Sequence, residues 1–181
     1  LSGGEGRMDA DALTVNPYMG ADTLRPYVDL GVSRGKGIFV LVKTSNPGSG
    51  DLQDLDAGGR PLYERVAELV RALGQGCRGA SGFSSVGAVV GATFPHQARR
   101  LRELLPETIF LVPGYGAQGA AAADVAAAFG KNGLGAIVNS SRGMIFAYRE
   151  EPWASRFGED RFEEAARAAA QAMADELRKV T

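Results

Sequence analysis

The stretch Thr108-Ile-Phe-Leu-Val-Pro-Gly-Tyr-Gly-Ala-Gln-Gly119 joins an apolar run to a glycine-rich segment. The run from Thr108 to Val112 predicts a buried strand, and the Ala-rich residues from Gly119 to Phe129 favour a helix. Glycines between a strand and a helix let backbone N–H groups approach a ligand closely. The N-terminus of the helix favours an anion such as phosphate, and Gln118 adds an amide donor.

A second motif, Asn139-Ser-Ser-Arg-Gly143, follows the next apolar run along the chain. Arg142 offers a planar charged fork and Gly143 a backbone amide, both suited to phosphate. Either motif alone is equally compatible with tight turns and a surface cation. Their position after consecutive strands predicts a phosphate site, because barrels frequently bind phosphate in the loops after strands seven and eight.

Five short apolar runs predict strands, and most of them are continuously apolar, as expected of parallel strands buried on both faces. The runs are Ala12–Asn16, Gly37–Val42, Val86–Gly91, Thr108–Val112 and Gly135–Asn139.

Helical patterns separate these runs. Asp22 is a candidate helix cap, Pro61 fits a first helical position, and Pro95 opens a helix with Leu101, Leu104 and Leu105. Near the C-terminus, one helical face is predicted by spacing. Its members are Phe162, Ala166, Ala169, Met173, Leu177 and Val180. Strands alternating with helices predict an α/β fold with a parallel sheet.

Each predicted strand runs into a cluster of polar, Gly and Pro residues. In a (β/α)₈ TIM barrel, functional sites lie at that end of the strands, and an open doubly wound sheet also binds ligands there. Five strands in 181 residues fit either an open sheet or part of a barrel, since a full barrel takes about 250 residues.

Composition narrows the functional class. The chain is 45% hydrophobic and 23% charged, with a net charge of −1, so no basic field points to nucleic acid. No apolar run approaches the about 20 residues that span a bilayer, and no membrane partner is expected. Cys77 is the single cysteine, which suits a reducing cytoplasm. Leu1 is not expected to be the native start, and residues 1–8 predict a loop.

Other reactive residues carry weaker signals. Thr44 and Ser45 end the second strand and could bond a polar heterocycle, or simply make a turn before Pro47. Lys43 could form a Schiff base if buried, although a lysine there is more often solvated. His96 has no partner at metal-ligand spacing, so no metal site is expected. Tyr148 and Trp153 are expected to be packing or rim residues, and Cys77 incidental.

Five segments together resemble the orotidine 5′-phosphate decarboxylases, and are most similar to the bacterial type 2 subgroup with "NPY" and "TSNP" signatures. They occur in order between about Asp9 and Tyr148. The segments are Ala10-Asp-Ala-Leu-Thr-Val-Asn-Pro-Tyr-Met-Gly20, Val42-Lys-Thr-Ser-Asn-Pro47, Val90-Gly-Ala-Thr-Phe-Pro95, Val112-Pro-Gly-Tyr-Gly-Ala-Gln-Gly119 and Asn139-Ser-Ser-Arg-Gly143.

The resemblance implies a TIM barrel that removes CO₂ from orotidine monophosphate to give UMP in pyrimidine biosynthesis, without a metal or organic cofactor. It also implies a homodimer whose sites borrow residues across the interface. Gln118, Arg142 and the Gly143 amide would hold the 5′-phosphate, and Thr44 or Ser45 would face the pyrimidine. The edge of the ring would be lined by Pro113 and Gly114, with Asn16 beside the ribose.

The family's catalytic residues have no match in this sequence. Catalysis in the family uses an Asp/Lys network from the first three strands, marked by an Asp-x-Lys-x-Gly-Asp motif that is absent here. We therefore expect residues 1–181 to form a single partial barrel domain, strands four to eight, with no catalytic residue and no activity alone. Two alternatives stay open: a Schiff-base aldolase using Lys43, and a phosphate-binding module that is not an enzyme.

Overall fold

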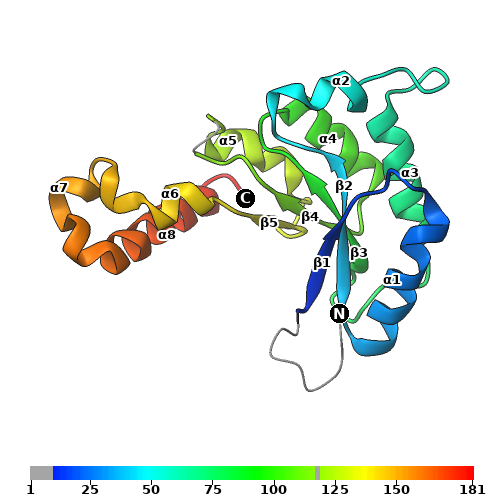
Figure 1. Ribbon diagram of the computed structural model, residues 1–181, viewed down its shortest axis with the longest axis horizontal. Helices are drawn as coiled ribbons and strands as arrows, with labels where there is room; N and C mark the ends of the chain where they lie inside the picture. The colour runs from blue at the N-terminus through cyan, green and yellow to red at the C-terminus, as the bar shows by residue number, and fades with distance from the viewer. Residues whose placement is uncertain (1–9, 117–118) are drawn as a thin grey trace.

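The computed structural model describes residues 10–116 and 119–181, and the predicted loop at residues 1–8 lies outside them. Five parallel strands form one sheet (Figure 1). The strands are β1 (Ala12–Val15), β2 (Gly37–Lys43), β3 (Ser84–Val90), β4 (Thr108–Val112) and β5 (Ala136–Val138). All five predicted strands are confirmed, with ends that differ by two residues at most.

The strand order distinguishes the two predicted architectures. The strands lie side by side as β1-β2-β3-β4-β5, the order in which they follow along the chain. An open doubly wound sheet reverses its strand order at a switch point, whereas a TIM barrel adds each strand beside the preceding one. The sheet is therefore a section of a barrel wall.

Helices connect the strands and extend the chain beyond β5. The α-helices are α1 (Ala21–Arg34), α2 (Gly50–Gln53), α3 (Leu62–Leu73), α4 (Pro95–Leu104), α5 (Ala122–Val125), α6 (Ser141–Ile145), α7 (Trp153–Phe157) and α8 (Phe162–Arg178). Short 3₁₀ turns are η1 (Pro47–Ser49), η2 (Ala126–Ala128), η3 (Ala147–Arg149) and η4 (Glu159–Arg161). No helix in the described ranges is both long and apolar enough to cross a membrane.

The main core lies between the sheet and the helices α1, α3 and α4. Helical residues such as Val28, Val70 and Leu101 are buried against strand residues such as Val40 and Phe110. Burying one side chain of this size contributes about 1.5–3 kcal/mol. The helical spacing after Pro61 and Pro95 is therefore explained by one apolar face per helix.

The opposite face of the sheet is only partly buried, contrary to the prediction that both faces are. Phe39, Leu41, Ile109 and Leu111 alternate with buried neighbours, and Ile137 is 51% exposed. β3 is the exception, because it lies at the centre of the sheet and is buried almost throughout. No element within residues 10–116 and 119–181 packs over this face.

Helix ends differ from the predictions. The cap of α1 is Gly20, whose positive φ needs a glycine, while Asp22 lies inside the first turn. Pro61 is the cap of α3, and the helix begins one residue later. The predicted helix over Gly119–Phe129 is reduced to α5 and η2, because Gly119 has a positive φ and Ala120 forms a β-bridge with Tyr115.

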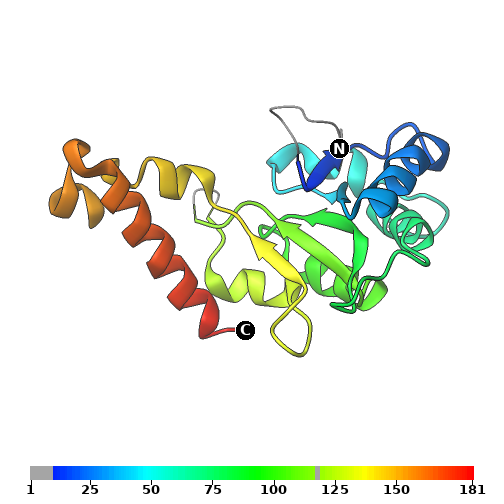
Figure 2. The ribbon, with the colours of Figure 1, turned by 90° about the horizontal axis from the view of Figure 1, so that it is seen from below.

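The C-terminal helix is confirmed, but its buried face differs from the predicted one. α8 buries Ala165, Ala169 and Met173, whereas Phe162 is 51% exposed and Val180 38%. The helices α6, α7 and α8 form an arm that projects from the β5 edge of the sheet (Figures 1 and 2).

The arm has a small core of its own. Ala147, Ala165 and Ala169 are its buried residues, and Tyr148 and Trp153 pack against them. The expected packing role of the two aromatic residues is thereby confirmed.

Arg102 connects α4 to β4, to η2 and to the residue before β5. Its guanidinium donates to the carbonyl oxygens of Leu105, Thr108, Ala128 and Gly135 at 2.7–2.9 Å. A half-buried charge needs such partners, because leaving it unpaired is costly. Sequence reasoning gave no sign of this role.

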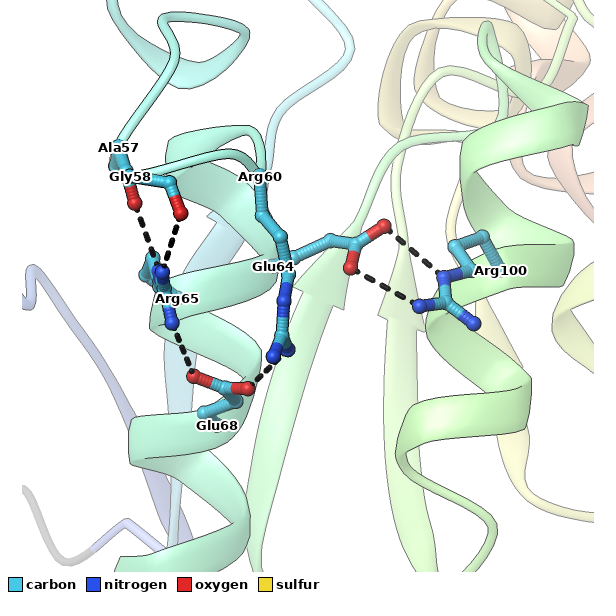
Figure 3. Close-up of polar contacts among 7 residues, drawn as sticks. All are labelled: Ala57, Gly58, Arg60, Glu64, Arg65, Glu68 and Arg100. Atoms are coloured by element: carbon cyan, nitrogen blue, oxygen red, sulfur yellow. Dashed lines mark hydrogen bonds and ion pairs between the residues drawn. The ribbon is translucent and has the colours of Figure 1, made fainter.

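An ion pair joins α3 to α4 (Figure 3). Glu64 of α3 accepts from Arg100 of α4 with both carboxylate oxygens, at 3.0 and 3.2 Å. Arg65 donates to the carbonyl oxygens of Ala57 and Gly58 at 2.9 Å. The segment before α3 is therefore fixed to the helix that follows it.

Candidate functional site

A hollow lies at the carboxyl ends of the strands, where the polar clusters of the sequence meet. Because all the strands are parallel, these ends share one edge of the sheet. The hollow has a volume of about 170 Å³ and is lined by Ser45, Pro113, Gly114, Tyr115, Asn139, Ser140, Ser141 and Arg142. It therefore brings together the loops after β2, β4 and β5.

One wall of the hollow carries positive charge and backbone donors. Arg142 and Gly143 lie in the first turn of α6, where backbone amides have no partner inside the helix. The Arg142 guanidinium is exposed and makes no ion pair within residues 10–116 and 119–181. Arg142 and Ser141 line the hollow, whereas Gly143 follows directly after them and does not line it. The Arg142 fork can accept a phosphate group.

Ser140 ties the loops after β4 and β5 together. It is buried, and its hydroxyl donates to the carbonyl oxygen of Tyr115 at 3.0 Å. A Cβ on Gly143 would lie 2.7 Å from the Ser140 Oγ, so a larger residue there would displace the Ser140 hydroxyl. Sequence reasoning missed Ser140, although it belongs to the quoted motif.

Asn139 is a second residue that sequence reasoning missed. Asn139 lines the hollow. Its Oδ1 is buried and has no hydrogen-bond partner among the described residues. An unpaired buried acceptor costs about 1–3 kcal/mol. A ligand that fills the hollow could remove that cost by donating a hydrogen bond.

The loop after β4 has the backbone that its glycines predict. Gly114, Gly116 and Gly119 have φ of 102°, 71° and 90°, values that residues other than glycine rarely adopt. Gln118 lies outside the described residues. The loop is also held from behind, because the Tyr115 hydroxyl donates to Glu176 of α8.

The environment of Tyr115 changes its acidity. Burial of the ring, followed by the neighbouring Glu176 carboxylate, raises the pKa of Tyr115 to about 12. The phenol therefore remains a hydrogen-bond donor at neutral pH, and the contact between the β4 loop and α8 persists there.

Thr44 and Ser45 differ in what their side chains do. The Thr44 hydroxyl donates to Asn46 Oδ1 at 2.6 Å and accepts from Gln53 Nε2 at 2.8 Å. Ser45 lines the hollow, and its hydroxyl makes no hydrogen bond to the described part of the chain. Of the two residues, Ser45 is thus the one available to a ligand.

Lys43 is fully buried at the end of β2, contrary to the expectation of a solvated lysine. Its Nζ donates to both carboxylate oxygens of Asp54, at 2.9 and 3.0 Å. It also lies 4.5 Å from the centre of the Phe94 ring. An amine held in this way is not available to form a Schiff base.

Comparison with known proteins identifies the family. Residues 4–157 match the family model described as "Orotidine 5'-phosphate decarboxylase / HUMPS family". The chain belongs to this family. It is 51% identical to an orotidine 5′-phosphate decarboxylase of Rhodopirellula baltica over 93% of its length, and 44% identical to one of Clostridium perfringens over 97%.

The chain spans 56% and 59% of the lengths of these two relatives. It also matches the solved structure of the Leishmania donovani OMP decarboxylase, with 35% identity and a TM-score of 0.69, over 94% of this chain and 57% of that one. The fold is therefore that of the orotidine 5′-phosphate decarboxylase TIM barrels, of which the chain covers part.

The hollow contains Ser45, Pro113, Gly114 and Arg142, which the family resemblance had singled out. Asn16 does not line it, and its carboxamide instead accepts from the Tyr18 amide at 3.0 Å. The described residues contain no cluster of three or more His, Cys, Asp or Glu that could hold a metal.

A larger hollow, of about 480 Å³, lies at the opposite end of the strands. Phe39, Gly87 and Ile109 form part of its lining. These residues belong to the sheet face that the described elements leave open, and barrels place their functional groups at the other end. We therefore assign no function to it.

Proposed function

We propose that the protein to which this chain belongs is an orotidine 5′-phosphate decarboxylase, a lyase that converts orotidine monophosphate to UMP and CO₂. The observation that carries the proposal is the meeting of Ser45, Pro113, Gly114 and Arg142 at one hollow, in a chain of this family. Residues 1–181 would form one partial barrel domain, strands four to eight, that supplies phosphate and base binding.

The chemistry of the hollow supports separate roles for its two sides. Arg142 and the Gly143 amide would hold the 5′-phosphate, together with Gln118. On the other side, Ser45 would contact the pyrimidine, with Pro113 and Gly114 along the edge of the ring. Thr44 is the weaker candidate for this contact, because Gln53 and Asn46 already engage its hydroxyl.

The role of this chain would be binding rather than chemistry. Binding a remote, non-reacting phosphate can lower the barrier at the reacting carbon, when the interaction is used to orient and hold the substrate in the transition state. Elsewhere in the intact protein, the family's Asp/Lys network would stabilise and protonate the carbanion formed on loss of CO₂. Residues 1–181 alone would then be inactive.

Substitution of Arg142 by alanine in the intact protein tests the assignment. We expect kcat/KM for orotidine monophosphate to fall roughly 100-fold, about 3 kcal/mol, because a charged contact to phosphate is lost. Activity on orotidine, which lacks the phosphate, should not change. Arg149→Ala is the matched control, since Arg149 is exposed and contacts the Phe146 and Tyr148 rings instead. An unchanged kcat/KM for Arg142→Ala would refute the phosphate role.

A homodimer in the cytoplasm is proposed for the intact protein. Tyr18 and Met19, after β1, are 81% and 74% exposed, and large apolar side chains of this kind are common at protein interfaces. Light scattering of the intact protein would reveal the dimer, and a monomer at micromolar concentration would contradict it.

A further inference from the structure

The proposed function leaves one buried charged group without a role. Lys43 is fully buried, directly precedes Thr44 and Ser45, and contacts both oxygens of Asp54. The Gln97 amide of α4 donates to the same Asp54 carboxylate at 2.9 Å. The end of β2 is therefore joined through Asp54 to the turn after α2 and, through Gln97, to α4.

Asp54 itself lies in a fixed segment, the turn between α2 and α3. Arg65 holds the carbonyl oxygens of Ala57 and Gly58 (Figure 3). Within the turn, the Ala57 amide donates to the Arg60 carbonyl at 2.7 Å. The carboxylate is therefore presented to Lys43 from a segment anchored on α3, and the ion pair couples α3 to the end of β2.

The backbone around Ser45 is also held by side chains from neighbouring elements. Gln53 Oε1 accepts from the Thr44 amide at 2.9 Å, and the Thr93 hydroxyl donates to the Ser45 carbonyl at 3.1 Å. A Cβ on Gly91 would lie 2.7 Å from the Ser45 Cα. These three contacts act on the backbone of Thr44 and Ser45, and none of the described hydrogen bonds engages the Ser45 hydroxyl.

We propose that Lys43, Asp54 and Gln53 are positioning residues, which fix the Ser45 hydroxyl across the hollow from Arg142. The inference rests on the proposed function, because it assigns Ser45 a ligand group to meet. None of the three residues is proposed to touch the substrate. They would set the distance between the base-binding and phosphate-binding sides, which a single nucleotide must span.

The energetics of the ion pair support a positioning role over a purely stabilising one. Burying a charge is costly, and well-packed apolar side chains often stabilise such a place as well or better. Removing Asp54 leaves the buried Lys43 charge without compensation, whereas removing Lys43 leaves a carboxylate that is 41% exposed. We therefore expect Asp54→Asn to lower Tm more than Lys43→Met does, because it leaves the buried ammonium group unpaired.

The test uses the intact protein with orotidine monophosphate as substrate and inorganic phosphate as a competitive inhibitor. For Asp54→Asn and Gln53→Ala we expect kcat/KM to fall about 10- to 100-fold, as found for misplaced binding groups. The Ki of inorganic phosphate should change less than about twofold, since Arg142 is untouched. Arg60→Ala is the control, because Arg60 belongs to the same turn and its guanidinium, among the described residues, pairs only with the Glu68 carboxylate (Figure 3).

A double variant separates positioning from simple packing. Lys43→Met with Asp54→Leu removes both charges, and we expect it to recover the Tm lost in Asp54→Asn without recovering kcat/KM. Wild-type kcat/KM in the double variant would overturn the proposal, because it would show that the pair only fills space. A parallel loss of phosphate binding and activity in Asp54→Asn would overturn it too, by indicating general disorder.

Hydrogen exchange provides a readout that does not depend on activity. In Asp54→Asn, the amides of residues 44–53 should exchange faster than in the wild type, while those of β4 should not. Unchanged exchange in this segment would refute the positioning role. If the wild-type protein fails to decarboxylate orotidine monophosphate, the proposed function fails, and the exchange experiment still decides whether the ion pair orders this segment.

Discussion

At the scale of single residues, the hollow depends on side chains that are small or absent. Gly143 leaves room for the Ser140 hydroxyl, and Gly91 leaves room for the backbone of Ser45. Protein interiors are packed so densely that even one added carbon is felt. The positions of the two sides of the hollow therefore depend on the absence of a side chain at these glycines as well as on hydrogen bonds.

Gly91→Ala tests this dependence in the intact protein. The added Cβ would lie 2.7 Å from both the N and the Cα of Ser45, so the backbone has to move. We expect a loss of about 1–3 kcal/mol in the free energy of unfolding, the usual cost of overpacking, measured by urea denaturation. Gly79→Ala is the control, since its nearest contact would be 3.9 Å away. Equal stability of the two variants would contradict the steric argument.

At the scale of elements, the loops of the hollow are held by elements behind them. The Tyr115 hydroxyl joins the β4 loop to Glu176 of α8, and Ser140 joins that loop to the start of α6. α8 therefore affects the hollow without lining it. A displacement of the C-terminal end of α8 should therefore also move the β4 loop, through the Tyr115 hydrogen bond.

The raised pKa of Tyr115, about 12 against an ordinary value of 10, predicts a pH dependence. Below pH 10 the phenol is protonated in the folded and unfolded chain, and its contribution to stability is complete. Between pH 10 and 12 the unfolded chain releases the proton while the folded chain keeps it, so that contribution falls as pH rises.

Unfolding of the intact protein at pH 8 and pH 11 would measure this effect. The wild type should lose more stability between the two values than Tyr115→Phe, because other groups titrate equally in both. The same loss in both proteins would show that Tyr115 does not carry the dependence.

At the scale of the whole molecule, the sheet has one covered face and one open face. Phe39, Leu41, Ile109 and Leu111 are partly exposed on the open side, and the outer edges of β1 and β5 pair with no other described strand. Exposed apolar faces and free strand edges promote association. The chain should therefore depend on further polypeptide to cover them.

The 181-residue polypeptide alone provides the test. We expect it to bind a hydrophobic dye such as ANS and to form larger species in light scattering, unlike the intact protein. The free strand edges and the open apolar face are the physical cause. A monomer that unfolds cooperatively in urea would contradict this prediction.

Local patterns in the sequence were enough to predict the strands, their parallel arrangement and the family. These features depend on local apolar runs and on Gly and Pro positions, such as the boundary between Val112 and Pro113, which act over a few residues. The same local signals placed Ser45, Gly114 and Arg142 at strand ends. They could not decide between an open sheet and a barrel, because strand order is a property of long-range pairing.

The contacts that hold those residues became visible in the three-dimensional structure. Lys43 and Asp54 are 11 residues apart, and Tyr115 and Glu176 are 61 apart, so no local pattern predicts either contact. Ser45 is a better candidate than Thr44 for contact with a ligand, because Gln53 at the end of α2 already bonds the Thr44 hydroxyl. Contacts of this kind depend on where packing brings distant segments together. No periodic pattern in a single sequence predicts them.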